Sequence, residues 1–273
     1  APTPEVSGKP FVTSWNAGII DEPLALKPKN SDLLPGKFSV SATEYVQFSR
    51  GNLLATRSSS SSDDWKLGFF ENQYDYGRDW DGGTRISHFL WSKDCMRSLD
   101  KTYDGSGAFD QDVFFTNFPN FAVNGVSAWH TLSQPEWAYL LGDSEERSGK
   151  HRTGVTVNGV MGLVIAPDKF SGTIGNTYDA TDWATAEIND GLVFLPAAGF
   201  RVGNIGGTSV DDAGSNGITD ITNAGSYGYY WSASPINSLI AFDLDFNSGD
   251  VYSNYSAARD RALSVRLVTD ATE

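Results

Sequence analysis

Glycine and proline recur too often in this chain for long helices to dominate its fold. The 273 residues include 28 Gly and 11 Pro. Glycine admits positive φ and proline lacks an N–H donor, so both residues interrupt helices and form turns. Short apolar segments lie between the turns, and hydrophobic residues make up 40% of the chain, which is enough to fill a core. The pattern predicts an α+β domain of many short antiparallel strands, one or two helices and long loops.

The first 35 residues differ from the rest because six of the prolines fall there. Each proline fixes φ and removes a backbone donor, so residues 1–35 are predicted to form an extended arm or linker. The globular domain is expected over residues 36–273. The opening APTPEVSGKP is typical of a mature N-terminus from which a leader or a lipid anchor has been removed.

The clearest helix signal lies in the middle of the chain. Ser133 can cap a helix, Pro135 fits its first turn, apolar residues follow at helical spacing from Trp137, and Gly142 can end it. A second helix is predicted over 182–188. Strands are predicted at 38–49 (two short ones), 65–70, 155–157 and 160–165 (a hairpin through Asn158-Gly159), 192–195, 228–234, 240–246 and 263–268.

The segment Ile240–Phe246 alternates apolar residues with Ala241, Asp243 and Asp245. Such a period of two is typical of a strand with one buried face, so Leu244 and Phe246 are expected inside and the two aspartates outside. No such alternation is found over 252–261, which is therefore predicted to be a loop.

The net charge disfavours some classes of partner, and the cysteine content excludes some kinds of site. The net charge is −14 and the sequence pI is about 4.5, which disfavours nucleic acid and anionic membrane surfaces. No apolar run is long enough to span a bilayer, so no membrane insertion is expected. Cys95 is the single cysteine, which rules out an internal disulfide and any zinc site that needs two cysteines.

Several ordered motifs together resemble a known group of proteins. They are FSVSATEYVQFSRGNL (38–53), ENQYDYG (71–77), WHTLSQPEWAYLL (129–141), VNGVMGLVIAPD (157–168), LPAAGFR (195–201) and YYWSAS…AFDLDFNSGDV…RALSVRLV (229–268). The chain resembles the C-type-lectin-fold surface proteins of Bacteroides-like gut bacteria and their phages, including the Fibrobacter succinogenes major paralogous domain. The resemblance implies a C-type lectin fold and an extracellular, cell-surface or phage-virion location.

Within that group, the C-terminal region 229–268 is most similar to the variable proteins of diversity-generating retroelements, in which adenines of a template are randomised. The family framework is matched by Ala241, Leu244, Phe246, Ser248, Gly249, Val251, Arg259 and the SVRLV end. The intervening residues are reachable from an AAC codon by changing its two adenines. Lys, Glu, Gln, Met and Trp are not reachable, and none occurs between Ser232 and Thr272. Strand propensity alone would also disfavour lysine and glutamate there.

The resemblance implies a non-enzymatic protein that binds a protein or glycan ligand on another cell surface, without a cofactor or metal. Tyrosine gives contact area at low entropic cost, and Ser and Asn give adaptable hydrogen bonds. The candidate ligand-binding residues are Ile236, Leu239, Asp243, Asp245, Asp250, Tyr252, Asn254, Tyr255, Ser256, Asp260 and Arg261.

Three alternatives stay open from the sequence. The first is a fixed-sequence surface adhesin or pilus-tip component that binds a glycan. The second is an enzyme on the scaffold of the formylglycine-generating enzymes, although that activity needs a pair of cysteines and Cys95 is alone. The third is a calcium-dependent lectin, for which Gln134-Pro135-Glu136 is close to the sugar-binding tripeptide but falls at a predicted helix start.

Overall fold

Short strands and two helices make up the domain in the computed structural model, as the density of glycine and proline predicts. The structure describes residues 32–59, 66–77, 85–91, 129–142, 152–202, 221–259 and 261–272, all of which belong to the unit that begins at Asp32. The described strands pair antiparallel in several small sheets, except that β7 and β9 pair in parallel. The α+β class is therefore observed.

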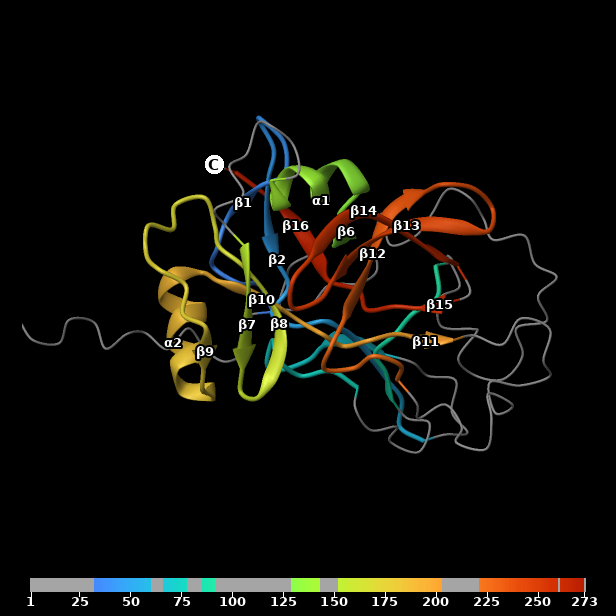
Figure 1. Ribbon diagram of the computed structural model, residues 1–273, viewed down its shortest axis with the longest axis horizontal. Helices are drawn as coiled ribbons and strands as arrows, with labels where there is room; N and C mark the ends of the chain where they lie inside the picture. The colour runs from blue at the N-terminus through green and yellow to red at the C-terminus, as the bar shows by residue number, and fades with distance from the viewer. Residues whose placement is uncertain are drawn as a thin grey trace, which may run out of the picture. The chain divides into compact units, whose positions relative to one another are not determined.

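One four-stranded sheet joins the two ends of the domain. Its order is β1 (Phe38–Ser39), β2 (Tyr45–Phe48), β16 (Leu267–Ala271) and β6 (His130–Thr131). The last strand of the chain thus lies between two earlier strands (Figure 1). Leu34, which the sequence analysis assigned to the arm, is buried in the same core.

The predicted hairpin at Asn158-Gly159 is confirmed. β7 (Arg152–Val157) and β8 (Val160–Ile165) pair directly, and both turn residues have positive φ, at 47° and 77°. Asn and Gly tolerate this left-handed backbone at little cost, which is why the dipeptide directs a tight turn. β10 (Val193–Pro196) and β9 (Thr177–Tyr178) complete the sheet.

Both predicted helices are present. α1 spans Gln134–Leu141, with a capping box between Ser133 and Glu136 and a left-handed Gly142 at its end. Because Gln134-Pro135-Glu136 begins this helix, the tripeptide serves in capping. α2 spans Ala180–Asp190, longer than predicted, because Asp179 caps its N-terminus by accepting bonds from two backbone amides.

The C-terminal part of the chain forms a meander of β12 (Gly228–Pro235), β13 (Ile240–Phe246) and β14 (Val251–Ala258). The prediction of a loop over 252–261 is therefore wrong for β14. The cause of the failed prediction is a bulge: Asp243 pairs with Tyr255 and Asp245 with Tyr252, so that two residues of β14, Ser253 and Asn254, lie opposite the single residue Leu244 of β13. A bulge breaks the period of two on which strand prediction depends.

Two further pieces complete the fold. β3 (Leu53–Thr56) pairs with β4 (Lys66–Phe69) and β5 (Arg85–Ile86). β11 (Arg201–Val202) pairs with β15 (Arg261–Ala262). The strand predicted at 263–268 overlaps β16 only at Leu267 and Val268, and of the residues before it Leu263 and Ser264 form single bridges.

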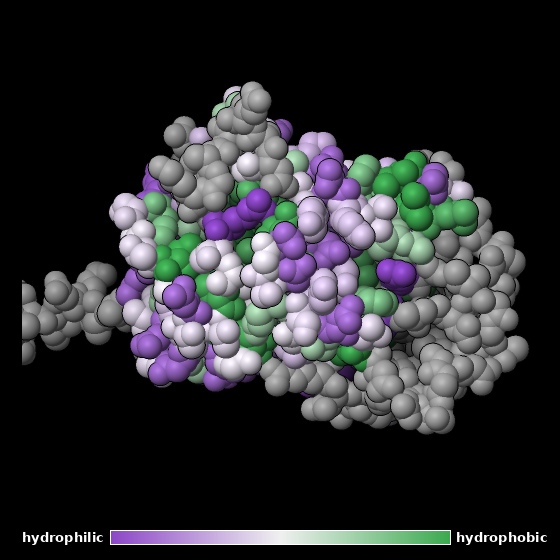
Figure 2. Space-filling model, viewed as in Figure 1, coloured by the Kyte–Doolittle hydropathy of each residue, from purple (hydrophilic) through white to green (hydrophobic). Residues whose placement is uncertain are grey.

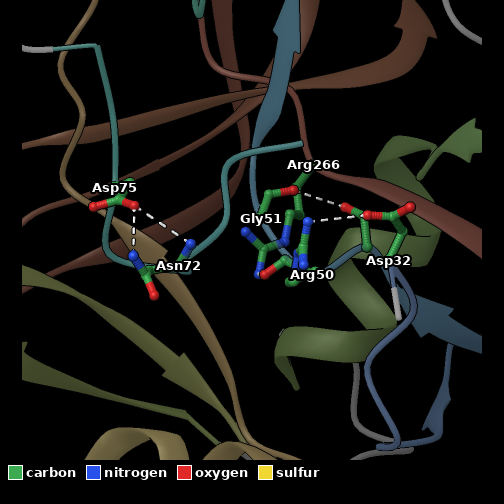
Figure 3. A network of polar contacts seen from close by, with 7 residues as sticks. Asp32, Arg50, Gly51, Asn72, Asp75 and Arg266 are labelled. Atoms are coloured by element: carbon green, nitrogen blue, oxygen red, sulfur yellow. Dashed lines mark hydrogen bonds and ion pairs between the residues drawn. The ribbon is translucent and has the colours of Figure 1, made fainter. Parts of the chain in front are cut away.

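A buried arginine connects these pieces. The Arg266 side chain is fully buried, and its guanidinium donates to Asn52 Oδ1 at 3.2 Å and to Gln73 Oε1 at 2.6 Å. Asn52 in turn donates to the Tyr230 hydroxyl, which donates to the Pro196 carbonyl. Nearby, Arg50 pairs with the buried Asp32 at 3.2 Å, and on the surface Asn72 bonds to Asp75 (Figure 3).

Replacement of Arg266 by Met is expected to destabilise the domain by about 3–5 kcal/mol, because it leaves the buried Asn52 Oδ1 without its Arg266 donor and removes one of the two donors to Gln73 Oε1. The free energy of unfolding from denaturant titration measures this loss. Lys66→Met, on the exposed side of β4, is the control and should change stability by no more than about 0.5 kcal/mol. Equal effects of the two substitutions would show that the Arg266 network is not needed for stability.

Candidate functional site

The meander of β12, β13 and β14 has two different faces. On one face Tyr230, Leu244 and Phe246 belong to the core cluster that includes the buried side of α1. α1 lies beside this sheet in Figure 1. The Phe246 ring fills the space above Gly228, where a Cβ would collide with it. These side chains hold the sheet to the domain and are unavailable to a ligand.

The opposite face is covered over part of its area. Trp231, Ala241 and Ala257 belong to a second core cluster with residues of β3 and β5. Asp243 and Asp245 share this face and are buried, at 1% and 9% exposure. The prediction that these two aspartates point outward is therefore wrong: alternation tells which residues share a face, but not whether another element covers it.

Most of the other candidate residues are exposed. Asp260 lies outside the described residues. The exposed ones are Ile236, Leu239, Asp250, Tyr252, Asn254, Tyr255, Ser256 and Arg261. They come from the β12–β13 turn, the β13–β14 turn, the edge strand β14 and the start of β15.

An apolar patch occupies the end of the β12–β13 hairpin. Leu239 is 70% exposed and Ile236 is 40% exposed. The turn is held by the Asn237 carboxamide oxygen, which accepts bonds from the amides of Leu239 and Ile240. Figure 2 shows this patch in green at the upper right, where Figure 1 places the hairpin. Exposed apolar side chains on a turn that is fixed by hydrogen bonds are typical of an interaction site.

Two tyrosines stand side by side on β14. Tyr252 and Tyr255 are 45% and 53% exposed, and their ring centroids are 6.1 Å apart. Three residues of separation would place them on opposite faces of a regular strand, but the bulge turns both toward the aspartate face. Tyr252 and Asn254 also border a pocket of about 340 Å³ against Gln134 and Ala138 of α1.

A second cluster of aromatic residues lies on the β12 side of the meander. It was not predicted from the sequence. Tyr227 stacks on Tyr229 at 6.0 Å, and Phe200 meets Tyr229 edge-on at 5.2 Å. The Arg261 guanidinium lies 5.1 Å from the Phe200 ring. Tyr229 is part of the framework motif YYWSAS, so the sequence analysis counted it with the scaffold.

The two buried aspartates have strongly perturbed acidity. Burial, and then the neighbouring Asp245 carboxylate, raise the pKa of Asp243 to about 8, while Arg261 opposes the shift. Burial raises the pKa of Asp245 to about 6. Neither oxygen of Asp243, nor Oδ1 of Asp245, has a hydrogen-bond partner in the structure of the described residues. Unsatisfied buried carboxylates are costly and often mark functional sites.

The two histidines that the structure describes, His88 and His130, lie in different surroundings. His88 is fully buried and bonds the Ala198 carbonyl; burial, then Arg201, lower the pKa of its imidazole to about 3. His130 lies on β6, 3.8 Å from Asp270, and His151, like Cys95, lies outside the described residues. Among the described side chains, no three of His, Cys, Asp and Glu gather where they could hold a metal ion.

A polar cavity of about 350 Å³ lies elsewhere in the domain. Its lining includes Asp75, Arg85, Ser87 and Arg201. Burial lowers the pKa of the Arg201 guanidinium to about 10, so the side chain stays charged at neutral pH. None of the candidate residues lies in this cavity.

Comparison with known proteins gives one match. The model of a family described as a domain of unknown function (DUF8237) matches residues 144–268. The matched segment contains the meander and its exposed residues but is less than half of the chain. Neither curated proteins nor solved structures gave a match. Over the described part of the chain, no helix is long and apolar enough to cross a membrane.

The buried aspartates make stability depend on pH. Because folding raises the pKa of Asp243 from about 3.8 to about 8, the folded state binds more protons than the unfolded state between these values. Stability is therefore greatest below pH 4 for this group and is lost as the pH rises through 8. Between pH 5 and 8.5 the loss should be on the order of 3 kcal/mol.

Asp243→Asn should flatten this pH dependence, measured as the free energy of unfolding at several pH values. Asp250→Asn, at an exposed position of the β13–β14 turn, should leave it as in the parent protein. A parent-like slope in Asp243→Asn would mean that Asp243 ionises normally in the folded protein.

Proposed function

We propose that this protein is a non-enzymatic binding protein with a C-type lectin fold, which displays a sequence-diversified C-terminal face. Its ligand would be a protein or a glycan on another cell surface. The protein itself would act outside the cell, on a cell surface or on a phage virion. Specificity would come from side-chain presentation, without turnover.

The observation that carries this proposal is the division of β14 and its turns into exposed and anchored residues. Tyr252, Asn254, Tyr255 and Ser256 are exposed, while Ala257 is buried. In β13, Ala241, Leu244 and Phe246 are buried framework residues of the family resemblance. A scaffold accepts varied side chains only where they make no contribution to the core, and β14 meets that condition at four positions.

The residue types at the exposed positions also support binding. Tyrosine, Asn and Ser side chains are exposed on β14, and the apolar Ile236 and Leu239 are exposed in the β12–β13 turn. This mixture of rigid aromatic contact area and adaptable polar groups is found in antibody recognition loops. The underlying sheet holds these groups on a rigid support, which limits the entropy lost on binding.

Simultaneous replacement of the exposed set should leave the domain folded. The variant Tyr252→Ser, Asn254→Ser, Tyr255→Ser, Ser256→Asn should lose no more than about 2 kcal/mol, because surface changes are small individually. The matched variant Leu244→Ser, Phe246→Ser on the neighbouring strand should lose at least about 5 kcal/mol or fail to fold. Thermal unfolding compares the two, and similar losses would contradict the proposed division.

Binding capacity can be tested by displaying two libraries of the chain. One library varies Tyr252, Asn254, Tyr255, Ser256 and Leu239, and the other varies the buried residues of β13. The first library is expected to stay folded and to yield specific binders against an unrelated purified protein. A first library that yields folded members but no binders would contradict the proposed function.

Genomic context separates a diversified protein from a fixed adhesin. A nearby reverse transcriptase gene, with an adenine-bearing copy of the sequence that encodes 229–268, is expected. If no such copy exists and isolates share one sequence at the exposed positions, the protein is a fixed-sequence adhesin.

A further inference from the structure

We propose that Asp243 and Asp245, together with Tyr252 and Tyr255, form a site for a cationic side chain, a lysine or an arginine, of a protein partner. This inference rests on the proposed binding function and names the chemistry that the face would recognise.

The register of the sheet brings the four groups together. Asp243 pairs with Tyr255, and Asp245 pairs with Tyr252. Residues that pair directly in an antiparallel sheet point to the same face, so each carboxylate lies at the base of an exposed tyrosine. On the other side, Asp245 pairs with Tyr229. The carboxylates are thus flanked by aromatic side chains from both neighbouring strands.

Burial without hydrogen bonds leaves the carboxylates in need of a partner. Asp243 is 1% exposed, and neither of its oxygens accepts a hydrogen bond from the described residues. Removing a carboxylate from water without compensation is costly, and a bound cation would supply both charge and N–H donors. Two apolar side chains at these positions would avoid this cost. A ligand therefore explains the presence of the two aspartates better than a contribution to stability does.

The tyrosines favour a cation over a neutral donor. The face of a phenol ring attracts ammonium and guanidinium groups, and a cation held between rings and carboxylates gains from both. The chain's own nearby cation, Arg261, acts on Asp243 through its charge, but it gives the Asp243 oxygens no hydrogen bond, and its guanidinium lies against the Phe200 ring. With a net charge of −14, the whole molecule also attracts basic partners.

A divalent metal fits this arrangement less well. Calcium takes six to eight oxygen ligands, whereas the described residues of the meander direct two carboxylates, those of Asp243 and Asp245, to this point. Lysine and arginine need fewer acceptors, and their aliphatic stems can lie along the Tyr252 and Tyr255 rings.

Binding of a cation should release a proton. The titratable and charged groups that act on Asp243 are Asp245 and Arg261, and Tyr229 lies beside the pair. Because the two aspartates repel one another when both are ionised, the free pair retains a proton near neutral pH, and a bound cation displaces it. Affinity for a cation should therefore rise as the pH increases from 5 to 8.5.

The test uses the full chain and three small probes: Nα-acetyl-lysine methylamide, Nα-acetyl-arginine methylamide and the neutral Nα-acetyl-norleucine methylamide. Binding is followed by NMR signals of the tyrosine rings. We expect saturable shifts with the two cationic probes, at least tenfold tighter binding than with the neutral probe, and at least tenfold weaker binding at pH 5 than at pH 8.5.

The double variant Asp243→Asn, Asp245→Asn should lose at least tenfold in affinity for the cationic probes while its thermal unfolding stays cooperative. Asp190→Asn, at the exposed C-terminal end of α2 and outside the candidate residues, is the matched control and should bind as the parent does. Equal binding of the neutral probe, or full retention of binding in the double variant, would overturn the cation site. Calcium chloride at millimolar concentration is a further arm, and a response to calcium without a response to lysine would identify a metal site instead.

Failure of this site and failure of the proposed function are distinguishable. If the display library yields binders but no cationic probe binds, the face recognises ligands by other chemistry. If the cationic probes bind but the library yields no binders, the protein has one fixed ligand and the diversified function is wrong.

Discussion

The buried guanidinium of Arg266 is the interaction on which the rest of the structure depends. It bonds to the side chains of Asn52 and Gln73, and through Asn52 and Tyr230 it reaches the Pro196 carbonyl. Gln73 in turn accepts from the Phe194 amide and donates to the Leu192 carbonyl. A planar group with five donors suits this role, since several chain segments can be held at fixed angles around one point. Loss of any one acceptor would leave a buried charge partly unsatisfied.

The Arg266 network fixes the interior without the outward side chains of β14. The C-terminal strand β16 is held between β2 and β6, and the segment before it is held by Arg266. Among the described strands β14 is an edge strand, which contributes Ala257 to the core and exposes Tyr252, Asn254, Tyr255 and Ser256. The molecule therefore combines a densely bonded interior with an exposed polar and aromatic edge, and the buried aspartates are the exception because they weaken the interior to which they belong.

Sequence reasoning succeeded where the signal is local. The capping box at Ser133 and the Asn158-Gly159 turn specify backbone conformations within a few residues, and both are found as predicted. It failed where the outcome depends on distant partners. The burial of Asp243 depends on how the meander packs in the domain, and the strand character of 252–258 is hidden by a bulge whose register is set by β13. Of the candidate residues in the described chain, Asp243 and Asp245 were misplaced, and the exposed positions of the turns, β14 and β15 were found.

The bulge in β14 has a consequence for how copies of this protein meet. A straight, unpaired edge strand is a template for a strand of another molecule, and acidic charge alone is a weak defence at high salt. No described strand pairs with the outer edge of β14, and the extra residue opposite Leu244 bends this edge and puts its N–H and C=O groups out of register with any regular neighbour. Crowded arrays of such molecules could then stay separate even when every exposed side chain on the edge is exchanged for a stickier one.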